Sequence, residues 1–343
     1  MKTFKPIFSL ILAVVVVTIM IPALLVLPFS SEKAVGKLAE NTTTAKKKAE
    51  PAAGLPASSV EVSVYRSAKK QIQKLPLETY VAGVVSAEMP ADFEIEALKA
   101  QALTARTYIV NQLTHKDGVA LPEGADVTDT EMHQVFNSEK ELKKVWGSDY
   151  SWKIKKIHQA VAETAGQIIT YDGTPITATF FSTSNGYTEN SEAYWEHAYP
   201  YLTSVSSPWD KNSPKFYDKK VISIREFEAK LGVKLSNSET VGTITERTPG
   251  KRVGTVKING KKWSGKEIRE ALGLKSADFD WERKGDQIVI STKGFGHGVG
   301  MSQYGANGMA KEGRTYQEIV KHYYKGVEVA SSNSLLSKLT AGK

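Results

Sequence analysis

The sequence predicts an α+β fold, and two observations support this class. Stretches typical of strands and of helices follow one another in mixed order, without the regular strand–helix alternation of a parallel α/β sheet. The composition is globular, with 41% hydrophobic and 24% charged residues among 343, so the chain can bury a sizeable core. We therefore expect a mixed-sheet core with long helices and a smaller lobe inserted into it.

The N-terminus predicts a transmembrane anchor. Lys2 and Lys5 precede a run from Pro6 to Ser31 that contains no charged residue. A helix needs roughly 20 residues to cross the hydrocarbon core of a membrane, and the apolar core of a cleaved signal is shorter, at roughly 7–15 residues. We interpret residues 1–31 as a cytoplasmic tail and an uncleaved signal anchor, which places the rest of the chain outside the cell. A cleaved signal peptide is the alternative.

The net charge indicates the class of partner, and the cysteine content limits the kinds of cross-link and metal site. The formal net charge of +8 favours an acidic partner, and nucleic acid, anionic lipid and the anionic cell wall all qualify. Export of the chain would count against nucleic acid. The chain has no cysteine, which excludes disulfides and thiolate metal sites.

The first half of the chain predicts a linker, two strands and a long helix. Residues 32–59 are rich in Lys, Ala, Glu, Thr and Pro and predict a flexible linker. Residues 60–65 alternate with period two, as a half-buried strand does, and residues 72–75 are expected to pair with them. Asp92 is expected to cap a helix over 93–113. One apolar stripe of that helix consists of Leu98, Ala102, Ala105 and Ile109.

The second half predicts the inserted lobe and the return to the main domain. We expect the main domain to comprise residues 60–206 and 288–330, the inserted lobe residues 207–287, and a C-terminal tail residues 331–343. The expected helices cover 154–164, 224–231, 264–272 and 315–324. The expected strands cover 167–171, 176–181 and 287–291, with turns at Asp172-Gly173 and Asn259-Gly260.

Glu88 is the first candidate for chemistry. It follows a small, apolar run in the stretch VVSAEMP (84–90). Partial desolvation there would raise the pKa of Glu88 toward the range useful for a general acid. Alternatively, Glu88 stabilises the N-terminal dipole of the following helix.

Lys99 and Arg106 lie seven residues apart and project from that helix in nearly the same direction. They either pair with neighbouring acidic residues or hold an acidic substrate.

Two further polar segments contain glycine. The stretch FSTSNGY (181–187) offers hydroxyl and amide groups, which suit sugar recognition because they both donate and accept hydrogen bonds. The stretch GFGHGVGMSQYG (294–305) has alternate glycines, which permit close approach of the backbone. It lacks the Gly-Lys-Ser/Thr of a phosphate loop. His297 in it is either a structural residue or part of a site. No His-Glu-x-x-His motif supports a zinc hydrolase.

Together these motifs resemble the stage II sporulation protein D family. The resemblance covers most of residues 60–324 in order, and rests on VVSAEMP, LKAQALTARTY (98–108), FSTSNGYTENSEAYW (181–195), PYLTSV (200–205) and GFGHGVGMSQYGANGMA (294–310). It implies a peptidoglycan lytic transglycosylase that cuts the bond between N-acetylmuramic acid (MurNAc) and N-acetylglucosamine and leaves a 1,6-anhydro-MurNAc end. It implies action in forespore engulfment, at the sporulation septum and the engulfing membrane. The implied partners are stage II sporulation protein P, an amidase that strips stem peptides from the glycan strands, and stage II sporulation protein M.

The resemblance also implies roles for single residues. Glu88 is the catalytic acid, and one carboxylate suffices because the C6 hydroxyl of the sugar is the nucleophile, whereas ordinary glycosidases need two. We expect Lys99 and Arg106 to organise the site. We expect Ser184, Asn185 and Tyr187 to contact the sugar. We expect the opposite wall of the site to consist of His297, Ser302, Gln303 and Tyr304. A non-catalytic peptidoglycan-binding scaffold that activates the amidase is the alternative.

One segment departs from the pattern of some relatives. These carry a Cys-Asp-x-x-His-Cys-Gln segment that can hold zinc, and the matching stretch here is TDTEMHQ (128–134). Its cysteines are missing, and His133 alone cannot build that site. We expect no metal and no cofactor.

Overall fold

The computed structural model describes residues 54–115, 121–195, 197–235 and 240–341. The predicted anchor (1–31) and all but the last residues of the predicted linker lie outside this part of the chain. Among the residues described, none of the helices is both long enough and apolar enough to span a bilayer.

The fold class is α+β, as predicted, but the strands form several small sheets instead of one mixed sheet. β1 (Glu61–Arg66) pairs antiparallel with β2 (Gln71–Pro76), which confirms the expected pairing, and parallel with β3 (Val127–Thr128). A second sheet has the order β14-β4-β5, and a third pairs β6 with β13. Their bounds are Gln167–Tyr171 (β4), Thr174–Pro175 (β5), Phe180–Phe181 (β6), Met301–Ser302 (β13) and Glu328–Ser331 (β14).

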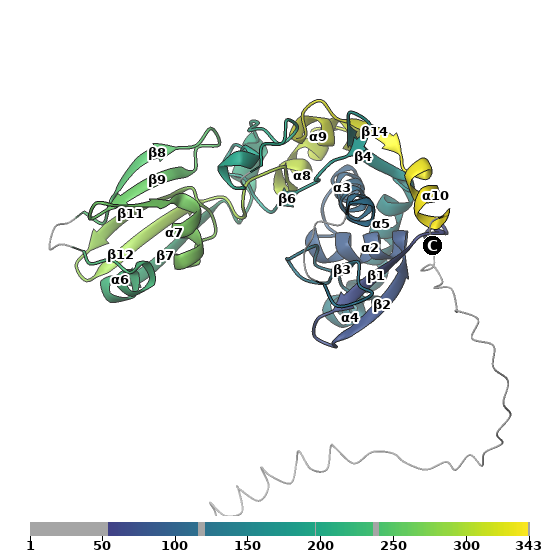
Figure 1. The fold of residues 1–343 in the computed structure, drawn as a ribbon, viewed down its shortest axis with the longest axis horizontal. Helices are drawn as coiled ribbons and strands as arrows, with labels where there is room; N and C mark the ends of the chain where they lie inside the picture. The colour runs from purple at the N-terminus through teal and green to yellow at the C-terminus, as the bar shows by residue number, and fades with distance from the viewer. Residues whose placement is uncertain (1–53, 116–120, 196, 236–239, 342–343) are drawn as a thin grey trace, which may run out of the picture. The chain divides into compact units, whose positions relative to one another are not determined.

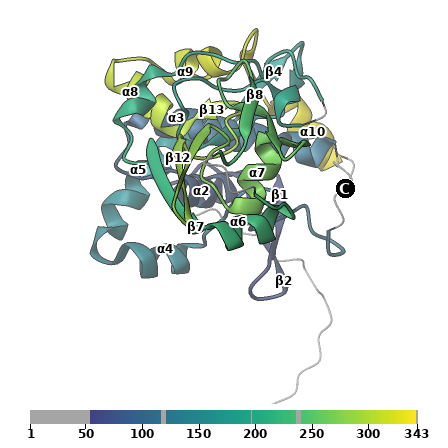
Figure 2. The same ribbon diagram turned by 90° about the vertical axis from the view of Figure 1, so that its left-hand side faces the viewer.

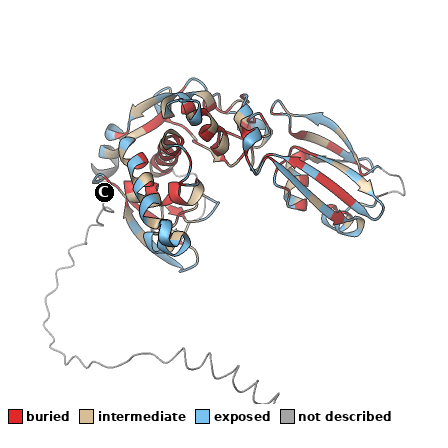
Figure 3. Ribbon diagram, turned by 180° about the vertical axis from the view of Figure 1, so that it is seen from behind, coloured by how far each residue is buried: buried red, intermediate tan, exposed pale blue. Residues whose placement is uncertain are grey.

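The main core is built around one helix. α3 (Ile95–Thr114) contacts α2, α5, α8 and α9, and Figure 3 shows buried residues along it. The expected stripe from Leu98 to Ile109 is fully buried, and so are Gln101 and Thr104 on other faces. The helices around α3 are α2 (Leu77–Glu88), α5 (Tyr150–Glu163), α8 (Gln303–Lys311), α9 (Tyr316–Tyr323) and α10 (Asn333–Ala341), whereas α4 (Glu139–Trp146) contacts α5.

A second core lies between two sheets and two helices. The sheet β11-β12-β7 consists of β7 (Tyr217–Ser223), β11 (Phe279–Lys284) and β12 (Gln287–Lys293), and the sheet β10-β9-β8 of β8 (Thr243–Arg247), β9 (Val253–Ile258) and β10 (Lys261–Ser264). Figures 1 and 2 show α6 (Ile224–Leu231) and α7 (Gly265–Leu272) beside these strands. Phe227, Ile268 and Phe279 are in this core. Short 3-10 turns elsewhere cover Gly147–Asp149, Ser191–Ala193 and Pro208–Asn212.

Local signals predicted several of these elements, and others differ. The structure confirms α6, α7 and the turns at Asp172-Gly173 and Asn259-Gly260, and φ is positive at all four turn residues.

Other elements differ from the prediction. The expected strand 176–181 is reduced to β6, and the expected tail 331–343 contains α10. Asp92 does not cap α3, because that helix starts at Ile95 with Glu94 as N-cap. β12 pairs with β7, so the boundary predicted between 287 and 288 cuts through one sheet. The division into domains itself stays a prediction.

Candidate active site

Glu88 is the last residue of α2, and its side chain is half-buried. The backbone N–H of Val135 donates a hydrogen bond of 2.9 Å to Glu88 Oε1. Gln303 Nε2 donates one of 3.0 Å to the main-chain oxygen of Glu88. No described residue donates to the second carboxylate oxygen, Oε2. The residue is therefore held at two points, while one oxygen is available to carry a proton.

Four surrounding features set the acidity of Glu88. Burial raises its pKa above the ordinary glutamate value, because a desolvated carboxylate is disfavoured. The Val135 N–H partly offsets this effect, and the nearby charge of Glu131 raises the pKa further. The position at the C-terminal end of α2 also disfavours a negative charge. It corrects the alternative that Glu88 stabilises a helix N-terminus, since α3 begins only at Ile95.

The donor Val135 is placed by its neighbour Phe136. The Phe136 ring packs against the backbone of Gly83 so closely that a Cβ on Gly83 would lie 2.2 Å from it. The same ring stacks on Tyr80, with ring centres 5.7 Å apart, and lies 4.7 Å from the guanidinium carbon of Arg66. Because Val135 contributes only a main-chain N–H, no side-chain motif could have identified it.

Helix α8 brings the glycine-rich motif to Glu88. Gln303 reaches the Glu88 backbone, and the Tyr304 ring meets the Phe93 ring edge-on at 4.9 Å. Asn307 Oδ1 accepts the N–H of Glu94 at 2.8 Å. The structure thus joins two motifs that lie 215 positions apart in the sequence: Gln303 contacts the Glu88 backbone, and the next residue, Tyr304, contacts Phe93.

Arg106 has a different place from the one expected. It is fully buried and bound to both carboxylate oxygens of Glu78, through Nε at 3.0 Å and Nη2 at 2.7 Å. It also donates to the carbonyl oxygens of Val161 and Gln167. The donors of Arg106 are thus used in joining α2, α3 and α5, and its expected part in organising the site stays a prediction.

Lys99 is also paired within the protein. Its ammonium group lies 2.7 Å from a Glu96 carboxylate oxygen and 2.5 Å from one of Glu163. Burial alone would lower its pKa, but the hydrogen bonds to the two carboxylates outweigh this effect and raise it. The pairing with Glu96 is one of the two alternatives for this residue, and its expected part in organising the site stays a prediction.

Ser184 and Ser302 serve a buried carboxylate. Asp210 accepts hydrogen bonds from Ser184 N at 2.9 Å, Ser184 Oγ at 2.8 Å, Ser302 Oγ at 2.6 Å and Ser207 Oγ at 2.5 Å. All four residues are fully buried. Burial raises the pKa of Asp210, although the hydroxyl donors act in the opposite direction. This placement differs from the expected roles, in which Ser184 contacts the sugar and Ser302 belongs to the opposite wall.

Asn185 connects the loop to the second core. Its amide nitrogen donates to Gly250 O and to Asp278 Oδ2, both at 2.9 Å. Its amide oxygen accepts the N–H of Tyr187 at 3.2 Å. The Tyr187 side chain is 41% exposed and can meet a ligand, whereas the amide of Asn185 is already used.

His297 is half-buried among aromatic rings. The rings of Phe181, Tyr194 and Trp195 lie with their centres 5.4–5.6 Å from it. Its Nδ1 accepts the N–H of Val299 at 3.1 Å. Burial, helped by nearby arginines, lowers the pKa of His297 to about 4, so the ring is neutral near pH 7. Its place in the opposite wall of the site stays a prediction.

The segment that matches the zinc-binding stretch of some relatives does not fit a metal. Thr128 stands at its first position, and the Thr128 hydroxyl and N–H both meet His133 Nδ1, at 3.0 and 3.3 Å. Gln134 Oε1 accepts the hydroxyl hydrogen of Tyr80 at 3.2 Å. Within the described ranges, no three His, Cys, Asp or Glu side chains gather as metal ligands would. The segment instead carries Glu131 and leads into Val135, beside Glu88.

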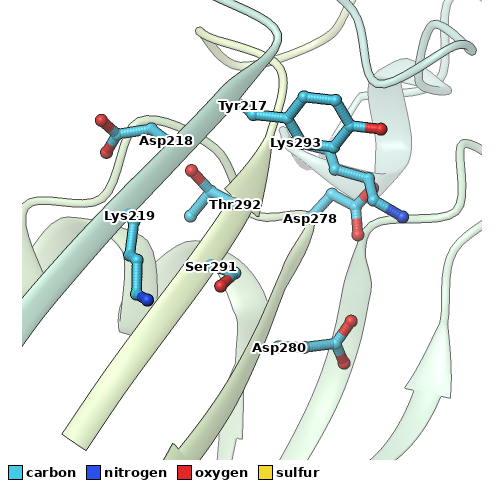
Figure 4. Close-up of a pocket in the computed structure, with 8 residues that line it drawn as sticks. All are labelled: Tyr217, Asp218, Lys219, Asp278, Asp280, Ser291, Thr292 and Lys293. Carbon is cyan, nitrogen blue, oxygen red and sulfur yellow. The ribbon is translucent and has the colours of Figure 1, made fainter.

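Two cavities lie elsewhere. One of about 420 Å³ lies on the sheet β11-β12-β7, where Figure 4 shows Ser291 and Thr292 between the side chains of β7 and those of Asp278 and Asp280. Both aspartates pair with Arg247, so neither resembles a free acid. Another cavity, of about 1460 Å³, is lined by β2, α2, α4 and α5. Neither contains Glu88.

Comparison with known proteins identifies relatives along the whole chain. A family model described as Stage II sporulation protein matches residues 65–171. The chain is 53% identical over 346 residues to stage II sporulation protein D of Bacillus subtilis, covering 100% of both chains. It is also 53% identical to stage II sporulation protein D of Bacillus amyloliquefaciens, covering 99% of this chain and 100% of the relative.

A more distant similarity is to a protein named amidase enhancer. The chain is 31% identical over 303 residues to this Bacillus subtilis protein, covering 73% of this chain and 40% of that protein. The full-length matches, and not this partial one, decide the family. The chain belongs to the stage II sporulation protein D family.

Proposed function

We propose that the protein is a peptidoglycan lytic transglycosylase in which Glu88 is the general acid and base. The observation that carries the proposal is the state of the Glu88 carboxyl: half-buried, with a raised pKa, one oxygen bound to the Val135 N–H and the other without a donor. Such a group holds a proton at higher pH than an ordinary glutamate and can deliver it to an oxygen of a substrate. The membership in a sporulation protein family supports a substrate in the cell wall.

The proposed reaction is balanced around this one carboxyl group. Glu88 transfers its proton to the glycosidic oxygen, and the bond between that oxygen and C1 of MurNAc breaks as positive charge develops on the sugar ring. The Val135 N–H stabilises the carboxylate that results. The C6 hydroxyl then attacks C1 and closes the 1,6-anhydro ring, while its proton returns to Glu88. The group is thereby restored without water.

A hydrolase is the second candidate for the reaction, because Glu131 lies near enough to Glu88 to raise its pKa. Two carboxylates could divide the work, with one as acid and the other as base for water. Glu131 is exposed, however, and so lacks the burial that tunes Glu88. We therefore favour the single-carboxyl route, in which Glu131 only adjusts acidity.

The products separate these mechanisms. The full-length protein in detergent would be incubated with amidase-treated peptidoglycan in water enriched in ¹⁸O, and the strand ends analysed by mass spectrometry. A lytic transglycosylase gives anhydro-MurNAc ends without ¹⁸O, whereas a hydrolase gives reducing ends that contain it. Glu88→Gln should give no products and should still bind glycan. Equal products from both proteins would exclude Glu88 as the acid.

A non-catalytic scaffold that activates an amidase is supported by the similarity to the amidase enhancer. The amidase proposed as partner is stage II sporulation protein P. Stage II sporulation protein M is proposed as a second partner. A pure scaffold would release no glycan fragments, and its Glu88→Gln variant would stimulate the amidase as fully as the wild type. Fragment release that depends on Glu88 would reject the scaffold as the whole function, although stimulation could coexist with it.

The proposed place of action is the outer face of the cell membrane, at the sporulation septum and the engulfing membrane, with no role in nucleic-acid binding. This proposal is supported by the charge-free stretch Pro6–Ser31 and by the net charge of +8, which suits an anionic wall. Protease added outside protoplasts of sporulating cells should digest the domain after residue 60. Protection of that domain would contradict the orientation.

A further inference from the structure

Helices α4 and α5 meet at a corner of the main domain, residues 139–156, and this α4–α5 corner exposes apolar side chains. A 3-10 turn, Gly147–Asp149, joins the two helices. Val145 before the turn is 73% exposed, and Trp152 after it is 43% exposed. Each helix packs against the protein through other residues, Leu142 in α4 and Ile157 in α5, which are buried. The two exposed side chains are therefore not needed to hold the corner in place.

Aromatic rings and ammonium groups gather around the turn. The ammonium nitrogen of Lys153 lies 6.0 Å from the centre of the Trp146 ring and 5.3 Å from that of Trp152. The ammonium nitrogen of Lys143 lies 5.2 Å from the centre of the Tyr150 ring. Trp and Tyr side chains have an apolar body and a polar edge, which suits the boundary between lipid and water. Lysines beside such rings are typical of protein surfaces that lie in the headgroup layer of a membrane.

The acidic groups of the corner are already neutralised within the protein. Residues 139–156 contain six lysines and three acidic residues, a net charge of +3. The three ion pairs are Glu139 with Lys143 at 2.7 Å, Asp149 with Lys153 at 3.1 Å, and Glu141 with Arg66 at 2.5 Å. An anionic partner would therefore meet no unpaired carboxylate in this segment.

Three lysines of the corner have no carboxylate partner. Lys140, Lys144 and Lys155 are exposed, and none of them forms an ion pair with a described residue. Lys140 and Lys144 are four residues apart and so lie on one face of α4, where Lys144 precedes Val145. Lys155 follows Trp152 by three residues and so lies on the same face of α5. Positive charges thus accompany both exposed apolar side chains.

The described chain begins beside this corner. A Cβ on Gly54 would lie 3.7 Å from His158 Nδ1 in α5. Gly54 also lines the cavity of about 1460 Å³ together with Lys140 and Lys155. The 22 residues between Gly54 and the predicted anchor, residues 1–31, can span at most about 75 Å. In an anchored protein the chain would enter the domain beside the corner, and so short a tether would make even a weak contact with the bilayer frequent.

An anionic bilayer fits this corner better than a soluble polyanion does. The three lysines alone would suit either partner, because both attract positive charge. Val145 and Trp152 gain only from a partner that removes them from water, as the boundary between headgroups and acyl chains does. A wall polymer of sugars and phosphates offers no comparable apolar layer. The combination of charge and exposed apolar groups therefore favours lipid.

We propose that the α4–α5 corner is a membrane-contact surface, in which Lys140, Lys144 and Lys155 bind anionic lipid headgroups while Val145 and Trp152 enter the boundary below them. The proposal rests on the place of action proposed above, the outer face of the cell membrane, and on no step of the proposed reaction. It gives the domain a second point of attachment besides the predicted anchor. A domain held at two points has fewer orientations than a domain on a tether alone, so the candidate acid would approach the wall from a fixed direction.

The contact can be measured in the full-length protein reconstituted into vesicles. The chain has no cysteine, so Ser148→Cys in the exposed turn gives one site for a fluorophore and keeps Val145 and Trp152 in place. A nitroxide attached to lipid quenches the fluorophore on contact. We expect quenching in phosphatidylcholine vesicles that contain phosphatidylglycerol. It should be lost in phosphatidylcholine alone and in about 1 M salt, where the Debye length is about 3 Å.

Matched variants separate the lipid contact from other causes. Lys140→Gln, Lys144→Gln and Lys155→Gln together should abolish the quenching, and Val145→Ser with Trp152→Ser should remove most of it. Lys311→Gln, Lys321→Gln and Lys325→Gln remove the same charge from exposed lysines elsewhere and should leave it unchanged. A fluorophore at Ser291→Cys, an exposed position of β12 in the second core, should not be quenched.

Flotation of the vesicles distinguishes failure of this proposal from failure of the proposed function. Protein that floats without quenching of the Ser148→Cys label would overturn the contact alone, and this is the result that binding only to wall polymer or to another protein would give. Quenching that survives the substitution of the three lysines, or that needs no phosphatidylglycerol, would overturn it as well. Protein that does not float would reject the proposed place of action together with the contact. No cleavage is measured, so a product analysis that rejects the transglycosylase reaction would leave the contact standing.

Discussion

The main-chain N–H of Val135 donates a hydrogen bond to Glu88 Oε1, and the opposite carboxylate oxygen has no donor among the described residues. This asymmetry makes the two oxygens inequivalent. Oε1 is held, so the side chain has one orientation, and Oε2 is where a proton can reside. A hydrogen bond that stabilises the ionised form would by itself lower the pKa of Glu88, and burial raises it by more.

Glu88→Gln is expected to stabilise the protein at pH 8 and to leave its stability unchanged at pH 4. Because the folded-state pKa of Glu88 is raised, the folded protein binds more protons than the unfolded chain in the window between the two pKa values, and stability falls as pH rises through that window. Glutamine keeps an oxygen for the Val135 N–H. The gain at pH 8 should be about 0.5–2 kcal/mol, the usual range of stabilising substitutions.

Urea unfolding at the two pH values measures this effect, and Glu123→Gln is the matched control. Glu123 is exposed, so its neutralisation should not change the free energy of unfolding at either pH. Equal differences between Glu88→Gln and wild type at both pH values would show that the carboxyl has an ordinary pKa in the folded protein.

Glu131→Gln is expected to move the alkaline limit of activity to lower pH. Removing the neighbouring negative charge lowers the pKa of Glu88, so the acid loses its proton at a lower pH. The maximal rate at acidic pH and the anhydro ends of the products should be unchanged. Rates of fragment release between pH 4 and pH 8 measure this shift. Loss of activity at every pH would instead identify Glu131 as a catalytic base and favour the hydrolase.

Gly83→Ala is expected to impair both stability and activity. The added methyl group would overlap with the Phe136 ring and approach Asn137 O to 2.8 Å, so the segment that contains Val135 has to move. Overpacking of this kind costs about 1–3 kcal/mol, and it should weaken the hydrogen bond to Glu88. Thermal unfolding and fragment release check the two effects. A variant as stable and active as wild type would show that the segment containing Val135 and Phe136 can move without cost to stability or activity.

Arg106→Ala is expected to destabilise the protein by about 3–5 kcal/mol, because it leaves the carboxylate of Glu78 buried without its partner. The double variant Glu78→Leu, Arg106→Met should lose much less. Lys143→Ala, which breaks an exposed ion pair with Glu139, should cost under about 1 kcal/mol. Urea unfolding compares the three. A stable Arg106→Ala protein with weakened glycan affinity would restore Arg106 to the binding site.

Local patterns allowed much of the fold to be predicted, while the pairing of distant groups could not be read from them. The turn at Asn259-Gly260 follows from the need for positive φ at both residues, a property of those two positions alone. The partner of Arg106 lies 28 positions away on another helix, and a helical arginine gives no sign of whether it meets solvent or a buried carboxylate.

The candidate site could be predicted only in part, because its contacts also join distant groups. Glu88 and Gln303 stand in motifs with recognisable side chains, and the structure brings them together. Ser184 and Ser302 have the hydroxyls expected of sugar contacts, but the carboxylate of Asp210 uses them inside the protein. Hydroxyl groups in a motif indicate hydrogen bonds without indicating whether the partner is a ligand or the protein itself.

The 215 positions between Glu88 and Gln303 also have a consequence for the time at which the protein becomes active. During synthesis the helix that ends at Glu88 emerges early, whereas α8 emerges only when most of the chain has been made. A nascent chain therefore carries the acid long before it has the amide that fixes the acid's backbone. On the proposed function, wall degradation would begin only once the finished protein has folded.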